Sequence, residues 1–393
     1  MINYTRQTIN NRQVLIPNEK SKKHLKEIKR EIEGKYGIQH ISRNDIIEQI
    51  IAFFLTRKNG DGYDYTSYER IDCVIYRTDI QNFFPSINTH KLYKKISSSN
   101  ILSQTTVDLI KYINFSKKIK GIPLGFPPAN ALANIYLEDF EKNVKLLLQP
   151  NLYYRFVDDM IIIKYIKKDT KTDVYQMNNV MIKELEKLYL KLNDSKTETI
   201  ILNFSKKFSD NPPSFKYLGY KFIFNNQLLI TVEESKIKKI NYNLKHLFYC
   251  YRCSDRDEKN FWVLYYRLKN LLYGVTTIDK NGNKRRFGLA YNYKRINDEI
   301  CLFNILLNCE KEIRRCPIST RQKYILFSLL SVLENGVKVK YNKENSLNFL
   351  RNRFDYTRLS LRQKSQIAQR LDISSTQEIN SSKIFYHLQF TSN

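Results

Sequence analysis

Apolar and polar positions along the first 232 residues follow two different periods. Three segments place their apolar side chains three or four positions apart, as amphipathic helices do: residues 43–55, 130–148 and 177–192. Nearly continuous apolar runs at residues 74–76 and 152–166 predict buried strands, and residues 215–232 predict further strands. The turn-rich residues 59–68 predict a loop. This part of the chain is therefore expected to fold as a mixed α+β structure.

The pattern changes near residue 233. Long segments with helical periodicity follow, and little strand-like alternation remains apart from a possible hairpin turn at Asn281-Gly282. Asp255 with Glu258 three residues later resembles a capping box, and Gly274 can close the helix that begins there. We therefore expect a domain boundary at 232/233, with a mostly helical region after it.

The net charge of the chain indicates the class of its partner. The chain has 393 residues, of which 66 are Lys or Arg and 39 are Asp or Glu, so its formal net charge is +27. Such an excess attracts phosphate groups, and it costs self-repulsion when no partner is bound. An AT-rich genome would explain many lysines but not the deficit of acids. The balance favours a nucleic-acid partner.

Apolar runs, the first residues and the cysteines bear on the cellular compartment of the protein. No apolar run approaches the roughly 18 residues of a membrane-spanning helix, and the first residues lack the apolar core of a signal peptide. Cys250 and Cys253 have the spacing of a metal-binding pair, but no second pair follows among the six cysteines. We expect reduced thiols, a cytoplasmic location and no membrane partner.

Three aspartates interrupt apolar strands. Asp79 follows the strand at residues 74–78, and Asp158-Asp159 divide the run at residues 152–166. Adjacent carboxylates raise each other's pKa, a cost that a divalent cation relieves. Mg²⁺ accepts a few carboxylates with water and phosphate, and two such ions catalyse phosphoryl transfer. An isolated Asp-Asp pair is usually an ordinary solvated turn, so the neighbouring sequence decides between these readings.

Five blocks accompany the aspartates in order: residues 76–87, 121–125, 154–159, 192–197 and 215–222. The first carries Asp79, and the third, Tyr-Arg-Phe-Val-Asp-Asp, is similar to a Tyr-x-Asp-Asp box with Phe in place of Tyr. Together they resemble the motifs of reverse transcriptases over about residues 70–225, and residues 12–17 weakly resemble the start of the fingers of that family.

The resemblance implies a fold and domains. It predicts a right-hand polymerase with a fingers-like region at 1–70, a fingers and palm core at 71–232 built on an antiparallel sheet with helices, and a helical thumb and C-terminal region at 233–393. It implies an RNA-directed DNA polymerase that binds an RNA template, deoxynucleoside triphosphates and the DNA product.

The resemblance also implies residue roles. Asp79, Asp158 and Asp159 would bind two Mg²⁺ ions, or Mn²⁺, and carry the catalysis. Phe84 would pack under the sugar and exclude a 2′-hydroxyl, Gly125 would let the backbone approach the nucleotide, and Lys196 would meet the triphosphate. The primer end would be positioned by Tyr217, Leu218, Gly219 and Tyr220. Core packing for Phe84, a solvated surface for Lys196 and plain hairpin packing for residues 217–220 are the alternatives.

Two residues depart from the family pattern, and signatures of several subtypes are not found. Leu124 stands where the family usually has Gln, and Ala129 lies where Ser is common, which bears on template choice and fidelity. Signatures of retron enzymes and of appended nuclease or integrase domains are missing. The remaining pattern is most like bacterial defence-associated and abortive-infection reverse transcriptases, which suggests an antiviral role, a dedicated non-coding RNA template, and a partner protein or homo-oligomer.

The C-terminal region carries cations and tyrosines together. Six cations there could follow a phosphate backbone: Lys236, Lys238, Lys239, Lys245, Arg285 and Arg286. The tyrosines at 242, 249, 251, 265 and 266 have helical spacing, which favours core packing over base stacking. The last 45 or so residues predict a further basic helix, either solvated or in contact with RNA.

Two alternatives to templated synthesis remain open. The same carboxylates would also serve DNA synthesis without a template or from a tyrosine primer, and the chain has 28 tyrosines. A polymerase fold that only binds RNA is the second alternative, which the intact Asp79, Asp158 and Asp159 disfavour.

Overall fold

A computed structural model describes residues 2–9, 12–57, 62–115, 119–166, 170–204, 212–278, 284–373 and 381–390. The chain divides into two compact units, Met1–Pro213 and Ser214–Asn393. The sequence pattern places the change of character at 232/233, whereas the division falls at 213/214. The residues between these positions therefore belong to the second unit.

The first unit is built on a four-stranded antiparallel sheet in the order β6-β7-β5-β8. Its strands are β5 (Cys73–Thr78), β6 (Leu152–Phe156), β7 (Asp159–Tyr165) and β8 (Glu198–Leu202). The apolar runs at residues 74–76 and 152–166 therefore form the centre of the sheet, as predicted. Asp79 follows β5 and Asp159 begins β7, so the pairing register of these two strands determines how close the carboxylates lie.

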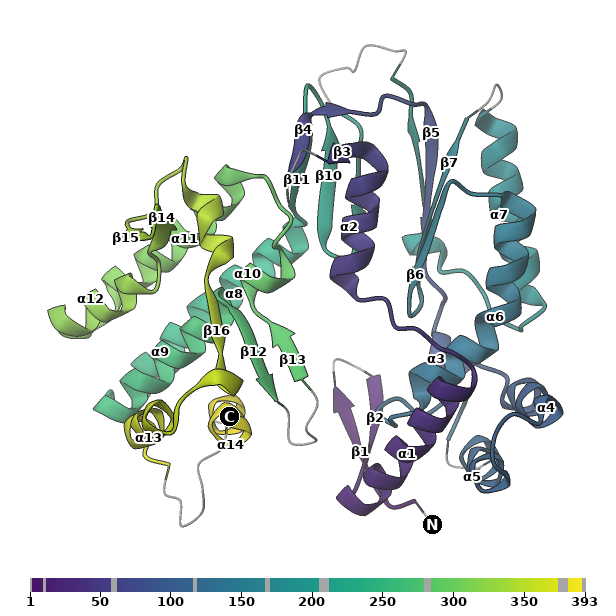
Figure 1. Cartoon of the computed structure of the whole chain (residues 1–393), viewed down its shortest axis with the longest axis horizontal. Coiled ribbons are helices and arrows are strands. Elements are labelled where there is room, and N and C mark those ends of the chain that lie inside the picture. Colours follow the sequence, from purple (N-terminus) through teal and green to yellow (C-terminus); the bar gives the residue numbers. More distant parts are fainter. Residues whose placement is uncertain are drawn as a thin grey trace. The chain divides into compact units, whose positions relative to one another are not determined.

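Helices cover both faces of this sheet, because its central strands are apolar on both sides. Val74, Tyr76, Met160 and Ile162 join a core with α6 (Ala129–Leu148) and α7 (Thr170–Glu186). The intervening Ile75, Ile161 and Ile163 are also buried. Figure 1 shows α6 and α7 on one side of the sheet and α2 (Arg43–Phe54) on the other.

The remaining elements of the first unit surround this centre. Two small hairpins are formed by β1 (Tyr4–Ile9) with β2 (Arg12–Pro17), and by β3 (Leu55–Arg57) with β4 (Tyr63–Tyr68). The helical elements are α1 (Glu19–Lys35), α3 (Phe83–Ser86), α4 (Thr89–Ser99), α5 (Gln104–Phe115) and the short η1 (Asp194–Lys196). The loop prediction for 59–68 is wrong over Tyr63–Tyr68, and residues 59–61 lie outside the described residues.

The second unit mixes helices with short strands. Two antiparallel helices, α8 (Glu234–Arg252) and α9 (Glu258–Leu272), pack together, and α11 (Glu299–Arg315) packs on α8. Its other helical elements are α10 (Leu289–Asn292), α12 (Thr320–Ser328), η2 (Ser346–Arg351), η3 (Tyr356–Arg358), α13 (Leu361–Arg370) and α14 (Ser381–Phe390). The helix α9 begins after Asp257, whose side chain accepts a hydrogen bond from the Asn260 backbone amide, so the cap is not Asp255.

Strands run through the second unit as well. The order β11-β10-β9 joins β9 (Ser214–Tyr217), β10 (Tyr220–Phe224) and β11 (Leu228–Val232), as predicted. A second sheet joins β12 (Gly274–Ile278), β13 (Lys284–Phe287) and β16 (Arg353–Asp355), and a hairpin joins β14 (Val332–Glu334) and β15 (Val337–Val339). The expectation of almost no strands after residue 233 is therefore wrong, because these strands are too short to show alternation. The Asn281-Gly282 turn lies outside the described residues.

Within the part of the chain that the structure describes, no helix combines the length and apolarity needed to span a bilayer.

Candidate active site

Strand β5 delivers Asp79 to the turn between β6 and β7. Thr78 of β5 pairs with Met160 of β7, so Asp79 comes level with Asp158 and Asp159 at the same end of the sheet. Asp79 is buried, and its carbonyl accepts a hydrogen bond of 2.9 Å from the backbone amide of Asn193. Antiparallel pairing thus brings together two sequence blocks that lie almost 80 residues apart in numbering.

The turn that carries Asp158 has a strained backbone. Phe156 pairs with Asp159, which leaves Val157 and Asp158 as the two turn residues. Val157 has φ of +63°, a conformation that a β-branched side chain adopts rarely and at a cost of order 1–3 kcal/mol. The surrounding structure must hold this turn in place.

Arg155 fixes the Val157-Asp158 turn through hydrogen bonds. Its guanidinium donates hydrogen bonds to the carbonyl of Val157 at 2.7 Å and to Oδ1 of Asn134 at 3.0 Å, and it also pairs with Glu141. Asn134 and Glu141 both lie on α6. Because the planar guanidinium presents several donors in a fixed geometry, one side chain ties the turn to a core helix. The position of Asp158 is thereby set relative to the core.

Lys196 forms an ion pair with Oδ2 of Asp79. The lysine ends η1, and the neighbouring Thr197 hydroxyl lies 2.7 Å from the Thr78 hydroxyl of β5 and donates to the Asn193 carbonyl at 3.0 Å. These contacts fix the residue 192–197 block against the end of β5. Half of the Lys196 side chain remains exposed, so its ammonium can reach a ligand.

A cavity of about 590 Å³ opens over this end of the sheet, within the first unit. Asp79, Asp158, Phe84 and Leu124 line it, and four cationic residues join them: Arg6, Arg12, Lys120 and Lys196. Two carboxylates beneath a positive rim suit a triphosphate that carries metal ions. Of these cations, only Lys196 was singled out from the sequence.

Gly125 shapes the wall of the cavity through a close backbone contact. Its φ is +95°, and a Cβ placed there would lie 2.3 Å from the Leu15 carbonyl of β2. The Leu15 amide donates to the Leu124 carbonyl at 2.8 Å. Any side chain at position 125 would therefore push β2 away. The close approach that the structure shows at Gly125 is to β2, which carries Arg12 into the cavity wall.

The carboxylates influence each other's protonation. Burial, reinforced by the charge of Asp79, raises the pKa of Asp158 above its ordinary value, against the opposing effect of Arg12 and Lys196. Burial and the charge of Asp158 likewise raise the pKa of Asp159, while Arg77 lowers it. Asp159 begins β7 and is not among the residues that line the cavity.

The site fits a cation that completes its coordination from outside the protein. Oδ1 of Asp79 is buried without a hydrogen-bond partner, which leaves a lone oxygen available for a metal. Among the described residues, no three His, Cys, Asp or Glu side chains form a ready-made metal cluster. Mg²⁺ commonly uses only one or two carboxylates and takes its other ligands from water and substrate phosphates. Asp79 and Asp158 match that pattern.

The four residues predicted to position the primer belong to the second unit. They form the turn between β9 and β10, where Leu218 and Gly219 have φ of +46° and +80° and Tyr217 pairs with Tyr220. The Tyr217 and Tyr220 rings are buried, and the Tyr220 hydroxyl donates to the Asn292 carbonyl at 2.8 Å. The two rings therefore serve the core of that unit, and any contact with a primer falls to the backbone of the turn or to Leu218.

Sequence reasoning missed several residues that the structure brings to the site. Arg12 lies in a block noted for its family likeness, but it was given no role. Arg155 lies inside the Tyr-Arg-Phe-Val-Asp-Asp block, three residues before Asp158. Its closeness to Asp158 in the sequence was the one signal for Arg155. Its partners Asn134 and Glu141 lie on α6, which the local sequence pattern does not reveal.

The chain matches the model of one known protein family. The model of the reverse transcriptase (RNA-dependent DNA polymerase) family matches residues 6–222, which is more than half of the chain. No curated protein matches the chain.

Solved structures with some likeness include telomerases of yeasts. Apo telomerase from Candida tropicalis is 14% identical with a TM-score of 0.44, over 98% of this chain and 68% of that one. Telomerase of the same species with a TWJ fragment of telomeric RNA is 15% identical with a TM-score of 0.42, over 100% and 64%. A C-terminally truncated form is 14% identical with a TM-score of 0.40, over 59% and 54%. The chain thus spans between about half and two thirds of the length of these telomerases. The family match, which includes every motif up to residue 222, confirms the resemblance seen in the sequence: the chain belongs to the reverse transcriptase (RNA-dependent DNA polymerase) family.

Proposed function

We propose that this chain is an RNA-directed DNA polymerase that adds deoxynucleotides to a primer by two-metal phosphoryl transfer. The observation that carries the proposal is the convergence of Asp79 and Asp158, from separate sequence blocks, in one cavity with a cationic rim. Membership of the reverse transcriptase family supports the reaction type. The substrates are deoxynucleoside triphosphates and an RNA template, and the products are DNA and pyrophosphate.

Asp79 and Asp158 would hold the metal ions, with Asp159 beside them. When bound, Mg²⁺ or Mn²⁺ supplies the positive charge that activates the primer hydroxyl and stabilises the leaving pyrophosphate. The buried, unpartnered Oδ1 of Asp79 and the raised pKa of Asp158 both support a cation here, since a positive charge would offset the cost of burying these carboxylates and relieve their repulsion.

The cations around the cavity would bind the triphosphate. Lys196 pairs with Asp79 in the structure, and it would turn to the phosphates when metal ions take over that carboxylate. Arg12 and Arg6 would meet the same phosphates from the β1–β2 hairpin. In phosphoryl transfer the protein mainly positions groups and neutralises charge, so these side chains suffice with the carboxylates.

Phe84 and Arg155 would complete the site in different ways. Phe84 would form the floor under the sugar and exclude a 2′-hydroxyl, which its place in the cavity wall supports. Arg155 would act as a positioning residue, because it holds the Val157-Asp158 turn without lining the cavity. The turn at residues 217–220 would guide the primer end through its backbone.

Asp158→Asn tests the catalytic assignment, since it removes a charge without adding bulk. We expect primer extension on an RNA template with Mg²⁺ to fall to background, while RNA affinity measured by fluorescence anisotropy stays within about twofold. Asp139→Asn is the matched control, because Asp139 is an exposed aspartate of the same unit outside the cavity. Wild-type rates in Asp158→Asn would refute the proposed site.

The biological setting belongs to the same proposal. We propose a bacterial cytoplasmic enzyme of antiviral defence that copies a dedicated non-coding RNA; the support is the sequence resemblance to defence-associated reverse transcriptases. The test is to sequence the nucleic acid that co-purifies with the protein from cells. One recurring RNA with complementary DNA supports the proposal, and a random sample of cellular RNA contradicts it.

A further inference from the structure

Helix α8 carries a ladder of three aromatic rings on one face: Tyr242, His246 and Tyr249. The Tyr242 and His246 rings lie 5.9 Å apart with an interplanar angle of 4°, and the His246 and Tyr249 rings lie 6.4 Å apart at 22°. Residues three and four apart share a helix face, so the three rings form one continuous stripe. Their planes are nearly parallel, and neighbouring rings are stacked on one another along the helix.

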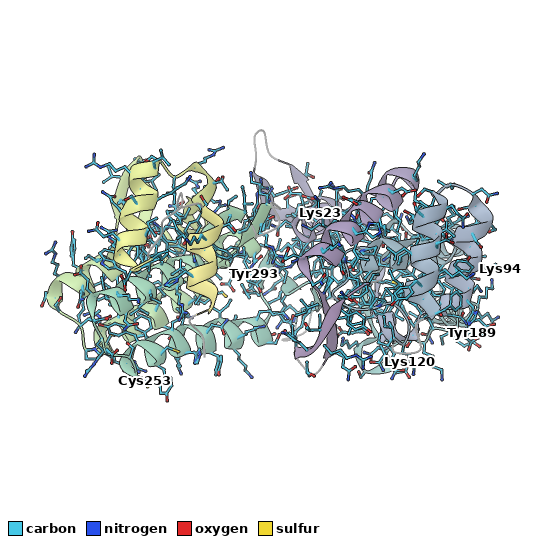
Figure 2. The ribbon with its side chains drawn as sticks, turned by 90° about the horizontal axis from the view of Figure 1, so that it is seen from below. Lys23, Lys94, Lys120, Tyr189, Cys253 and Tyr293 are labelled. Atoms are coloured by element: carbon cyan, nitrogen blue, oxygen red, sulfur yellow. The ribbon has the colours of Figure 1, made fainter. Side chains whose placement is uncertain are left out.

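The ladder is exposed, although core packing was expected for its tyrosines. Tyr242 is 66% exposed and Tyr249 is 58% exposed, whereas Tyr251 and Tyr266 are buried as expected. In Figure 2 α8, which is followed by Cys253, runs along one edge of its unit, with side chains projecting outward. Two large rings left in water on one stripe forgo the free energy of burial, and such exposed patches commonly mark interaction sites.

Positive charge surrounds the ladder. Lys238 and Lys239 lie four and three residues before Tyr242, and Lys245 lies three residues after it, so they flank the stripe on both sides. Residues 235–252 contain no Asp or Glu. Within the described parts of the chain, no carboxylate forms an ion pair with any of these three lysines. Their charges are therefore available to an anionic partner.

Exposed aromatic side chains beside unpaired cations suit a partner that has both flat rings and phosphates. A nucleic-acid duplex hides its base faces in the stack and offers mainly phosphates, whereas a single strand offers both. The proposed function already requires an RNA template, so single-stranded RNA is the polymer that this chain must hold. The combination of ladder and lysines is thus matched to the unpaired part of an RNA.

We propose that the ladder of Tyr242, His246 and Tyr249 binds single-stranded RNA by stacking unpaired bases on its rings, while Lys238, Lys239 and Lys245 contact the phosphates. The proposal deepens the function inferred above and rests on it for the identity of the polymer. It assigns to α8 a recognition role separate from the cavity that holds Asp79.

Fluorescence anisotropy tests this surface without any polymerase reaction. The probes are a labelled oligouridine and an RNA duplex with the same number of phosphates. Tyr242→Ala/Tyr249→Ala should bind the single strand at least about tenfold more weakly and the duplex within about twofold, since stacking contributes most to unpaired bases. Tyr242→Phe/Tyr249→Phe should bind the single strand like wild type, because the ring faces remain.

Two further variants separate stacking from charge and from chance exposure. Lys238→Gln/Lys239→Gln/Lys245→Gln should flatten the log–log salt dependence by about 2, at about 0.7 for each lost phosphate contact on a single strand. The double tyrosine variants should leave that slope unchanged. Tyr175→Ala is the matched control, because Tyr175 is 70% exposed in the other unit and outside the ladder.

The outcomes decide the proposal. Equal losses on the duplex and the single strand, or no loss on either, would overturn base stacking. A loss of the same size on oligodeoxythymidine supports base stacking, because neither the rings nor the lysines contact a 2′-hydroxyl in this proposal. Primer extension by the wild-type enzyme is measured in parallel: if it proceeds while the tyrosine variants bind normally, the ladder proposal fails and the polymerase proposal stands.

Discussion

The proposed role of the Phe84 side chain in sugar selection can be tested by substitution. Phe84 lies in the cavity wall with 9% of its surface exposed, which is where a ring would block a 2′-hydroxyl. Phe84→Val should raise the use of ribonucleotides relative to deoxynucleotides by about tenfold or more, an effect of about 1.4 kcal/mol on discrimination. Single-nucleotide incorporation measures this ratio, and Phe84→Tyr, which keeps the ring, should not change it. An unchanged ratio in Phe84→Val would remove the residue from this role.

Lys269 gives a prediction about pH. Burial lowers its pKa to about 8, although its ammonium lies 3.7 Å from the centre of the Phe354 ring. Because the unfolded chain binds this proton more tightly, the lysine destabilises the fold below about pH 8, and the penalty fades as pH rises toward the unfolded pKa. Lys269→Met should therefore be more stable at pH 7 by about 1–3 kcal/mol, and the gain should shrink by pH 10. Denaturant unfolding at both pH values measures it, and a gain independent of pH would show that the ring contact offsets the burial.

At the scale of elements, the hairpin of β6 and β7 depends on a clamp from α6. Arg155→Lys keeps the charge but loses the geometry that joins the Val157 carbonyl to Asn134 and Glu141. We expect kcat to fall by about tenfold to a hundredfold, as small displacements of reacting groups do, with KM for the nucleotide changing less. Arg314→Lys, at another arginine paired with a glutamate, is the control and should leave kcat unchanged. A change confined to thermal stability would show that Arg155 only supports the core.

Elements also show what the sequence could and could not predict. The strands around Asp79 and Asp158 were predictable, because their apolar runs are buried on both faces. The turn-forming residues in 59–68 predict a loop, whereas Tyr63–Tyr68 forms a strand through its pairing with the short β3, a contact that local sequence does not contain. The strained Val157 and the Arg155 clamp depend on contacts with a distant helix, which local pattern does not contain. The exposure of Tyr242 was missed for the same reason: helical spacing alone does not say which face of α8 is covered.

At the scale of the whole molecule, a net charge of +27 should make RNA affinity strongly dependent on salt. Each neutralised phosphate on a single strand contributes about −0.7 to the log–log slope. A slope near zero would show that the cations do not meet the backbone.

The C-terminal segment contributes to this picture as part of the core of its unit. The predicted basic helix is present as α13, which carries Arg362, Lys364 and Arg370. The segment also packs into its unit: β16 pairs with β12, Phe349 and Tyr356 are fully buried, and the Arg370 guanidinium lies 3.8 Å from the centre of a Trp262 ring. Removing residues 346–393 should therefore unfold the second unit rather than remove an RNA contact. Thermal unfolding followed by circular dichroism checks this, and a stable truncated protein would contradict it.

The central claim is templated synthesis of DNA on RNA at the Asp79–Asp158 cavity. The most direct measurement gives wild-type protein a primer annealed to RNA templates that differ only in the next base, with one deoxynucleotide at a time and Mg²⁺. The account predicts extension only with the complementary deoxynucleotide, and none by Asp158→Asn. Extension that ignores the template base, or no extension by the wild-type protein, would contradict it.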